Sequence, residues 1–157
     1  MNSPRELVAE RFSLLCRMHT LLCALPLEHV IETMRPLPVE VMSEAPHFVL
    51  GLAIIRGAPV PVINVARLLG IEGGSVTRFI TMRAGSRQVA FAVDGVVGVR
   101  RLSAESLQEL PPLLQDIGAD IISSVGTLDA ELLVVLRDAC VIPESLWERL
   151  GVDGTAS

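Results

Sequence analysis

The most specific chemistry in this sequence belongs to one arginine, Arg56, which precedes Gly57 and separates two apolar runs. An Arg-Gly break between such runs predicts a tight turn with the guanidinium pointing outward, fixed by its neighbours. A guanidinium stays charged and offers a planar fork of donors, which suits recognition of a carboxylate on a partner. Residues 46–70 are therefore interpreted as a binding edge and not as a catalytic centre.

Residue types that do catalysis are present, but their spacing does not favour it. No HxH or HExxH pattern connects the three histidines, His19, His29 and His47. Asp94 lies inside an apolar run, where a buried acid could be catalytic, but the glycine after it favours an Asp-Gly turn between two strands. Residues 73–75 lack the lysine and spacing of a phosphate loop. We therefore expect no catalytic residue, no metal, no cofactor and no enzymatic activity.

Three cysteines, Cys16, Cys23 and Cys140, show no CxxC spacing. If residues 12–18 and 21–27 form a hairpin, Cys16 and Cys23 face each other across it. A cross-strand disulfide and a Cys/His metal site are then conceivable. Two buried thiols in a reducing cytosol are the favoured interpretation.

Length and composition limit the remaining classes. At 157 residues the chain fits one domain, or one domain made of two small lobes. Half of its residues are apolar, yet no run reaches the roughly 18 residues of a membrane helix. The N-terminus is charged and lacks the apolar core of a signal peptide, so a cytoplasmic location is expected. This much apolar sequence also predicts an exposed apolar surface for a partner.

The charge balance argues against nucleic acid. The net charge is −5, and all thirteen basic residues are arginine. Phosphate backbones favour a basic stripe, and base stacking needs aromatic side chains, which are scarce here. No basic cluster supports an electrostatic membrane anchor either.

Short apolar runs bounded by Gly, Pro or Ser dominate the chain, a pattern typical of β-barrels and sandwiches. They predict strands over residues 12–18, 21–27, 29–34, 48–55, 58–65, 76–83, 87–93, 96–101 and 132–136. Short helices are predicted over residues 4–11, 66–69, 103–110 and 143–150. The glycine-containing segment 71–75 is the best candidate for a hinge between two lobes.

Four segments in this order are similar to motifs of one family: ALPLEHVIETM (24–34), PHFVLGLAIIRGAPVPVINV (46–65), FAVDGVVGVRRLSAESL (91–107) and SSVGTLDAELLVVL (123–136). The chain thereby resembles the CheW-like adaptors, which couple chemoreceptors to the histidine kinase CheA in bacterial chemosensory arrays. The resemblance covers nearly everything from Phe12 to Ile142.

The resemblance implies an all-β fold of two five-stranded β-barrel lobes, packed together with a third apolar seam between them. The CheW-like domain would span residues 12–142 and divide near residues 71–76, with the terminal strands crossing between lobes. A helical extension, 1–11, and a C-terminal helix and tail, 143–157, would flank it. The implied partners are the regulatory domain of CheA, which contacts one lobe, and the cytoplasmic receptor tip, which occupies the groove between lobes.

The resemblance also implies protein-binding residues. The arginine of the family's N-L-R-G motif matches Arg56, with Gly57 after it and Ile54 before it. Val30 and Glu32 match the family's V-x-E-I motif. A solvated strand face is an equally good interpretation of Glu32, because half of a strand's positions face outward.

This chain departs from the family pattern at several positions. Ile54 replaces an asparagine, which removes a side chain that could satisfy the turn and adds apolar surface beside Arg56. Asn64 replaces an aspartate, Arg137 an acid, Cys23 an aromatic residue, and His19-Thr20 a Gly-Gly turn. These changes leave open which receptor and kinase the chain serves.

Three other functions stay open as alternatives. The first is a divergent CheW-like scaffold in a pathway that controls surface motility, development or gene expression. The second is a small-molecule-binding or enzymatic β-barrel, which would need a pocket near Asp94 with further polar side chains. The third is an oligonucleotide-binding barrel, which the acidic balance disfavours.

Overall fold

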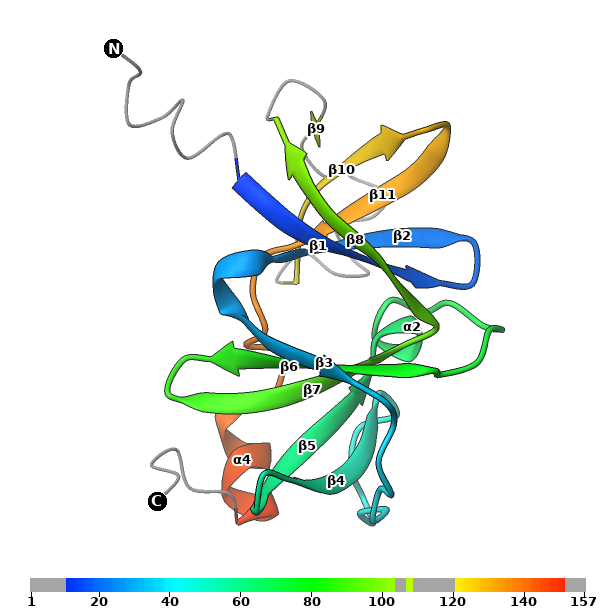
Figure 1. Cartoon of the computed structure of the whole chain (residues 1–157). Coiled ribbons are helices and arrows are strands. Elements are labelled where there is room, and N and C mark those ends of the chain that lie inside the picture. The colour runs from blue at the N-terminus through cyan, green and yellow to red at the C-terminus, as the bar shows by residue number, and fades with distance from the viewer. Residues whose placement is uncertain (1–10, 104–106, 109–120, 152–157) are drawn as a thin grey trace.

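The computed structural model describes residues 11–103, 107–108 and 121–151, which form two lobes built on two β-sheets (Figure 1). One sheet has the strand order β8-β1-β2-β11-β10-β9. Its strands are β1 (Arg11–Met18), β2 (Leu21–Pro26), β8 (Gly95–Leu102), β9 (Leu107–Gln108), β10 (Ile122–Leu128) and β11 (Glu131–Leu136). We call it the six-stranded sheet.

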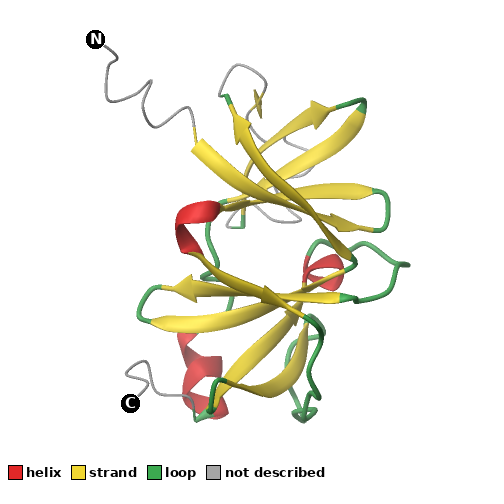
Figure 2. Ribbon diagram, viewed as in Figure 1, coloured by secondary structure: helices red, strands yellow, loops and turns green. Residues whose placement is uncertain are grey.

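The second sheet has the order β3-β6-β7-β5-β4 and is called the five-stranded sheet. Its strands are β3 (Val30–Met34), β4 (Val49–Ile55), β5 (Ala58–Asn64), β6 (Arg78–Ala84) and β7 (Arg87–Val93). Helices are few and short (Figure 2): η1 (Leu27–His29), α2 (Val65–Leu68) and α4 (Glu144–Leu150). No helix among the described residues is long and apolar enough to cross a membrane.

The chain changes sheets at η1, between β2 and β3, and at Asp94, between β7 and β8. Residues 71–76, expected from the sequence to divide the lobes, instead join α2 to β6. The strands before and after this segment, β5 and β6, both belong to the five-stranded sheet. A glycine-containing loop is thus not the lobe boundary here, because the parallel pairing of β5 with β7 keeps residues 30–93 in one sheet.

Alternation of side chains divides the apolar core into three clusters. One lies on the inner face of the five-stranded sheet and includes Val62 and Phe79. A second includes Leu15 and Leu133 of the six-stranded sheet. The largest cluster draws on both sheets and on α4. Successive residues of a strand face opposite sides, so each strand supplies its own lobe's core and the seam between lobes. This matches the third apolar seam implied by the family resemblance.

The all-β class is confirmed, but the expected closed five-stranded barrels are not observed. One sheet carries a sixth, two-residue strand, β9, and neither sheet closes by strand pairing among the described residues. The physical reason in the five-stranded sheet is that its edge strand β4 is paired on its open side with Glu40, not with β3. The two sheets nonetheless form two packed lobes.

Most predicted strands are confirmed within a few residues, while the region after β8 differs. The helix predicted over 103–110 is wrong at Leu107 and Gln108, which pair with β10 as a strand. Its other residues, and the helix predicted over 4–11 apart from the strand residue Arg11, lie outside the described residues. β10 was not predicted. The turn at 66–69 and the C-terminal helix are observed, the latter ending at Gly151 in the left-handed region.

The C-terminal helix α4 is fastened to β7 by one arginine. Arg87 donates two hydrogen bonds to Glu144, at 2.7 and 2.6 Å, and its guanidinium lies 4.8 Å from the ring centroid of Trp147. Trp147 itself is buried in the largest core cluster. A fork-shaped cation that both stacks and pairs in this way fixes the helix orientation.

Candidate functional site

Arg56 occupies the first position of a two-residue hairpin between β4 and β5, where Ile55 pairs directly with Ala58. Its φ is 54° and that of Gly57 is 81°, the positive values of a type I′ turn. Asparagine, aspartate or glycine normally takes the first of these positions, since other side chains are strained there. An arginine kept in this conformation points to a use for its side chain.

The carboxylate beside Arg56 comes from the opposite edge of the same sheet. Nε and Nη2 of Arg56 donate to the two carboxylate oxygens of Glu32, at 2.9 and 2.7 Å. Glu32 lies on β3 and Arg56 follows β4, and these are the two edge strands of the five-stranded sheet. The ion pair therefore connects the two edge strands of the sheet. The Arg56 side chain is 77% exposed, so its fork is held rigidly at the surface.

The hydrogen bonds from Arg56 hold the pKa of Glu32 below its usual range and raise the pKa of Arg56. Two other Arg–Glu ion pairs have the same effect on the pKa of their glutamate. Hydrogen bonds from Arg17 lower the pKa of Glu131, and those from Arg87 lower the pKa of Glu144. All three carboxylates thus favour the ionised form in the folded protein.

These pKa shifts predict a loss of stability in acid. A carboxyl group whose pKa is lower in the folded chain contributes stability above its unfolded pKa and loses it as the pH falls through the folded pKa. We expect the urea midpoint to fall between pH about 5 and about 2, the range in which glutamates are protonated. A variant with Gln in place of Glu32, Glu131 and Glu144 should lose less stability over this range. An identical pH dependence in both proteins would contradict the assignment.

Apolar surface surrounds the Arg56–Glu32 pair. A shallow hollow of about 240 Å³ is lined by the pair together with Met34, Leu37 and Ile55. Ile54, on the other face of β4, is 65% exposed. An exposed charged fork beside exposed apolar side chains is the composition of a protein-binding surface. We call Glu32, Met34, Leu37 and Arg56, together with Ile54 on the outer side of the hairpin, the clasp surface; Ile55 lines the hollow but is itself buried.

The structure brings together four of the five residues predicted from sequence, and separates the fifth. Arg56, Gly57 and Ile54 share the β4–β5 hairpin, and Glu32 meets them from β3. Val30 begins β3 but packs, half-buried, against the core cluster between the sheets. Val30 therefore lies apart from the clasp surface, and its role in binding stays a prediction.

Leu37 and Met34 of the clasp surface were missed from the sequence. Leu37 lies in the segment Arg35-Pro36-Leu37-Pro38, which carries neither strand nor helix periodicity. The only sequence signal was its position directly after β3, since the chain must turn there from one edge strand towards the other.

Other positions singled out from the sequence have local structural roles. Asn64 caps α2, its side-chain oxygen accepting the N–H of Arg67 at 3.0 Å, so this departure from the family's aspartate keeps the cap. Cys16 and Cys23 are opposed in the β1–β2 register, as predicted, and are buried free thiols. The side-chain hydrogen bond between Cys23 and Cys16, together with burial, raises the pKa of Cys23. The thiolate, the form that ligates metals, is therefore disfavoured.

Asp94 forms the predicted turn between two strands, joining β7 to β8. Its carboxylate accepts a backbone N–H, that of His19, at 2.7 Å. The carboxylate is therefore used in a structural hydrogen bond. Among the described residues, no group of three or more His, Cys, Asp or Glu side chains could hold a metal ion.

Comparisons with known proteins identify the family. The family model of the CheW-like domain matches residues 13–143. A chemotaxis protein CheW of Thermotoga maritima is 36% identical over 120 residues, covering 75% of this chain and 76% of that protein. CheW of Klebsiella aerogenes is 28% identical over 98 residues; the match covers 60% of this chain but only 59% of the Klebsiella protein.

A further relative and a solved structure agree. Protein FrzA of Myxococcus xanthus is 29% identical, with 66% of each chain covered. The crystal structure of the scaffolding protein TtCheW from Thermoanaerobacter tengcongensis shares the fold, with a TM-score of 0.70 and 22% identity. That match covers 81% of this chain and 88% of TtCheW. From the family model and these relatives, the chain belongs to the CheW-like domain family.

Proposed function

We propose that this protein is a non-catalytic, cytoplasmic adaptor that binds the regulatory domain of a CheA-type kinase and the cytoplasmic tip of a chemoreceptor. The observation that carries the proposal is Arg56, kept at a positive φ and clamped by Glu32 so that its fork stays at the surface. We assign the clasp surface to the kinase domain. A rigid guanidinium flanked by Ile54 suits a partner with a carboxylate beside an apolar patch.

A second surface supports the receptor as the other partner. Val96 and Val99 of β8 pair with Cys16 and Leu14 of β1, whose side chains belong to the core cluster between the sheets. Cross-strand partners share a face, so these valines extend that apolar face outward. With Val97, they are 36–50% exposed. We call Val96, Val97 and Val99 the β8 strip and assign it to the receptor tip.

Two binding surfaces on one small domain are what an adaptor needs. The clasp surface belongs to the five-stranded sheet and the β8 strip to the six-stranded sheet. Each partner could therefore bind without displacing the other, and recruitment to membrane-associated receptor arrays would follow. Relatives named as chemotaxis proteins favour this role over a scaffold that serves another output.

Titration of the purified chain with a CheA regulatory domain and with a receptor cytoplasmic fragment tests the proposal. Val99→Arg should weaken receptor binding about tenfold or more, because it buries an unpaired charge in an apolar contact. Its kinase affinity should stay within about twofold. Ser86→Arg, which adds the same charge at the exposed β6–β7 turn, is the matched control. The proposal fails if the wild-type chain binds neither partner.

A further inference from the structure

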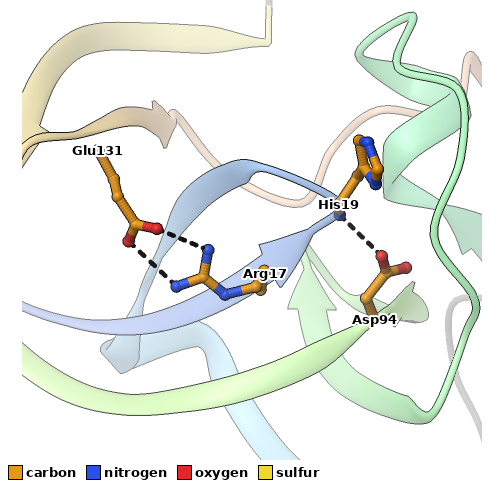
Figure 3. A network of polar contacts seen from close by, with 4 residues as sticks. All are labelled: Arg17, His19, Asp94 and Glu131. Carbon is orange, nitrogen blue, oxygen red and sulfur yellow. Dashed lines mark hydrogen bonds and ion pairs between the residues drawn. The ribbon is translucent and has the colours of Figure 1, made fainter.

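Asp94 binds the β1–β2 hairpin of the six-stranded sheet at the point where the chain arrives from the five-stranded sheet (Figure 3). Its carboxylate accepts the backbone N–H of His19 at 2.7 Å, and its own N–H donates to the carbonyl of Arg17 at 2.9 Å. His19 is in a turn and has a φ of 54°. The two hydrogen bonds hold the tip of the hairpin against the crossing point.

The same residue contacts the α2–β6 loop of the five-stranded lobe. A Cβ added at Gly74 would lie 1.9 Å from the carboxylate Oδ2 of Asp94, so only glycine permits this approach. The hydroxyl of Thr77 donates to the carbonyl of Asp94, and the N–H of Thr77 to that of Val93 at 3.0 Å. Asp94 is thus the meeting point of three segments from the two lobes.

The contacts of Asp94 lie where the chain passes from one sheet to the other, so they bear on how the two lobes are oriented. Among the described residues, the strands cross between sheets at η1 and at Asp94, and Figure 1 shows these crossings on opposite sides of the seam. The seam itself is formed by apolar side chains, which pack without directional bonds. The hydrogen bonds at Asp94 add directional contacts to this packing, and a third connection between the lobes, from β11 to α4, is held on β7 by Arg87 and Glu144.

We propose that Asp94 is a positioning residue that fixes the orientation of the two lobes and thereby the face on which the receptor tip binds. The proposal rests on the proposed function, because it takes the β8 strip as the receptor surface. A ligand of the clasp surface touches the five-stranded lobe alone. Strand β8, which carries the β8 strip, starts directly after Asp94. A ligand bound to the β8 strip lies beside the seam, so its affinity depends on how the two lobes are oriented.

The Arg17–Glu131 pair provides a matched control in the same neighbourhood (Figure 3). Arg17 donates two hydrogen bonds to Glu131, at 3.0 and 3.1 Å. Both residues belong to the six-stranded sheet, so this pair does not connect the lobes. Glu131→Gln should leave the orientation of the lobes unchanged.

A spin-label distance measurement tests the orientation without any partner. Labels are placed at Ser86→Cys in the five-stranded lobe and at Thr127→Cys in the six-stranded lobe, with exposed Cys140 replaced by Ser. The wild-type background and Glu131→Gln should give one narrow distribution. Asp94→Ala and Gly74→Ala should give a broad or shifted one. Asp94→Asn should stay narrow, because its amide oxygen can still accept the N–H of His19.

Binding supplies the second readout, on variants whose folding is checked by circular dichroism. Asp94→Ala should lower the affinity for the receptor fragment roughly tenfold and leave the affinity for the kinase domain within about twofold of the wild-type value. The proposal is overturned if Asp94→Ala keeps the wild-type distances, or if Glu131→Gln broadens them equally. A wild-type chain that binds no receptor fragment refutes the proposed function, while the distances still decide whether Asp94 fixes the orientation.

Discussion

Replacing Gly51 with alanine is expected to lower the free energy of unfolding by about 3–5 kcal/mol, in the range of the most damaging substitutions. A Cβ at this position would lie 2.0 Å from the backbone oxygen of Glu40 and 2.7 Å from its carbonyl carbon. The φ of Gly51 is 143°, a value that residues with a side chain rarely adopt. Both the contact and the backbone conformation therefore exclude alanine.

The contacting backbone cannot move away easily. Glu40 and Leu52 exchange two backbone hydrogen bonds, at 2.8 and 2.9 Å, which fasten the β3–β4 connection to the edge of the sheet. Accommodating a methyl group would break this bridge and expose the edge strand β4.

Gly57→Ala is the matched control for Gly51→Ala. Gly57 also has a positive φ, 81°, but nothing lies within 4 Å of its added Cβ. Replacing Gly57 with alanine should lower the free energy of unfolding by only about 1 kcal/mol, because only the backbone conformation is unfavourable for alanine there. Urea unfolding of both variants measures the difference. Equal destabilisation would contradict the close approach of Glu40.

Arg56→Glu should lower the affinity for the kinase regulatory domain by roughly a hundredfold, about 2.7 kcal/mol. The change removes the donor fork, places a like charge beside Glu32, and repels the partner's carboxylate. The thermal midpoint should hardly change, because the Arg56 side chain is largely exposed and exposed pairs contribute little to stability. Calorimetric titration and a melting curve on the same sample measure both quantities.

The swapped double variant, Arg56→Glu with Glu32→Arg, separates the two roles of the arginine. It rebuilds an ion pair across the sheet edges with the charges exchanged. If Arg56 contacts the partner directly, the swap should not regain affinity. Recovered binding would instead show that the pair acts only by holding the hairpin. A well-folded Arg56→Glu variant that binds like the wild type would remove Arg56 from the interface.

The β4–β5 hairpin and its arginine could be predicted from the sequence because every signal was local. Apolar runs of strand length flank a dipeptide whose glycine marks the turn. The pairing of Arg56 with Glu32 could not be predicted, since these residues are 24 positions apart on edge strands that only the curvature of the sheet brings together. Glu32 was equally consistent with a solvated strand face.

The position of the lobe boundary and the existence of β10 could not be predicted from the sequence, for related reasons. Parallel pairing of β5 with β7 and of β11 with β2 connects strands that are distant in sequence. Gly73 and Gly74 have the composition of a hinge, yet Gly74 is required for tight packing against Asp94. β10, with the sequence ISSVGTL, is too polar for a strand signal and depends on its pairing with β11.

The strand order also has a consequence for synthesis. A ribosome releases residues 30–93, the whole five-stranded sheet, as one continuous stretch. The β1–β2 hairpin emerges before all of them, yet β2 receives its parallel neighbour β11 only when residues 131–136 follow. Until then the β2 edge of the β1–β2 hairpin is unpaired, and the apolar side chains of the hairpin are exposed to solvent. The first strands made are therefore among the last to be completed.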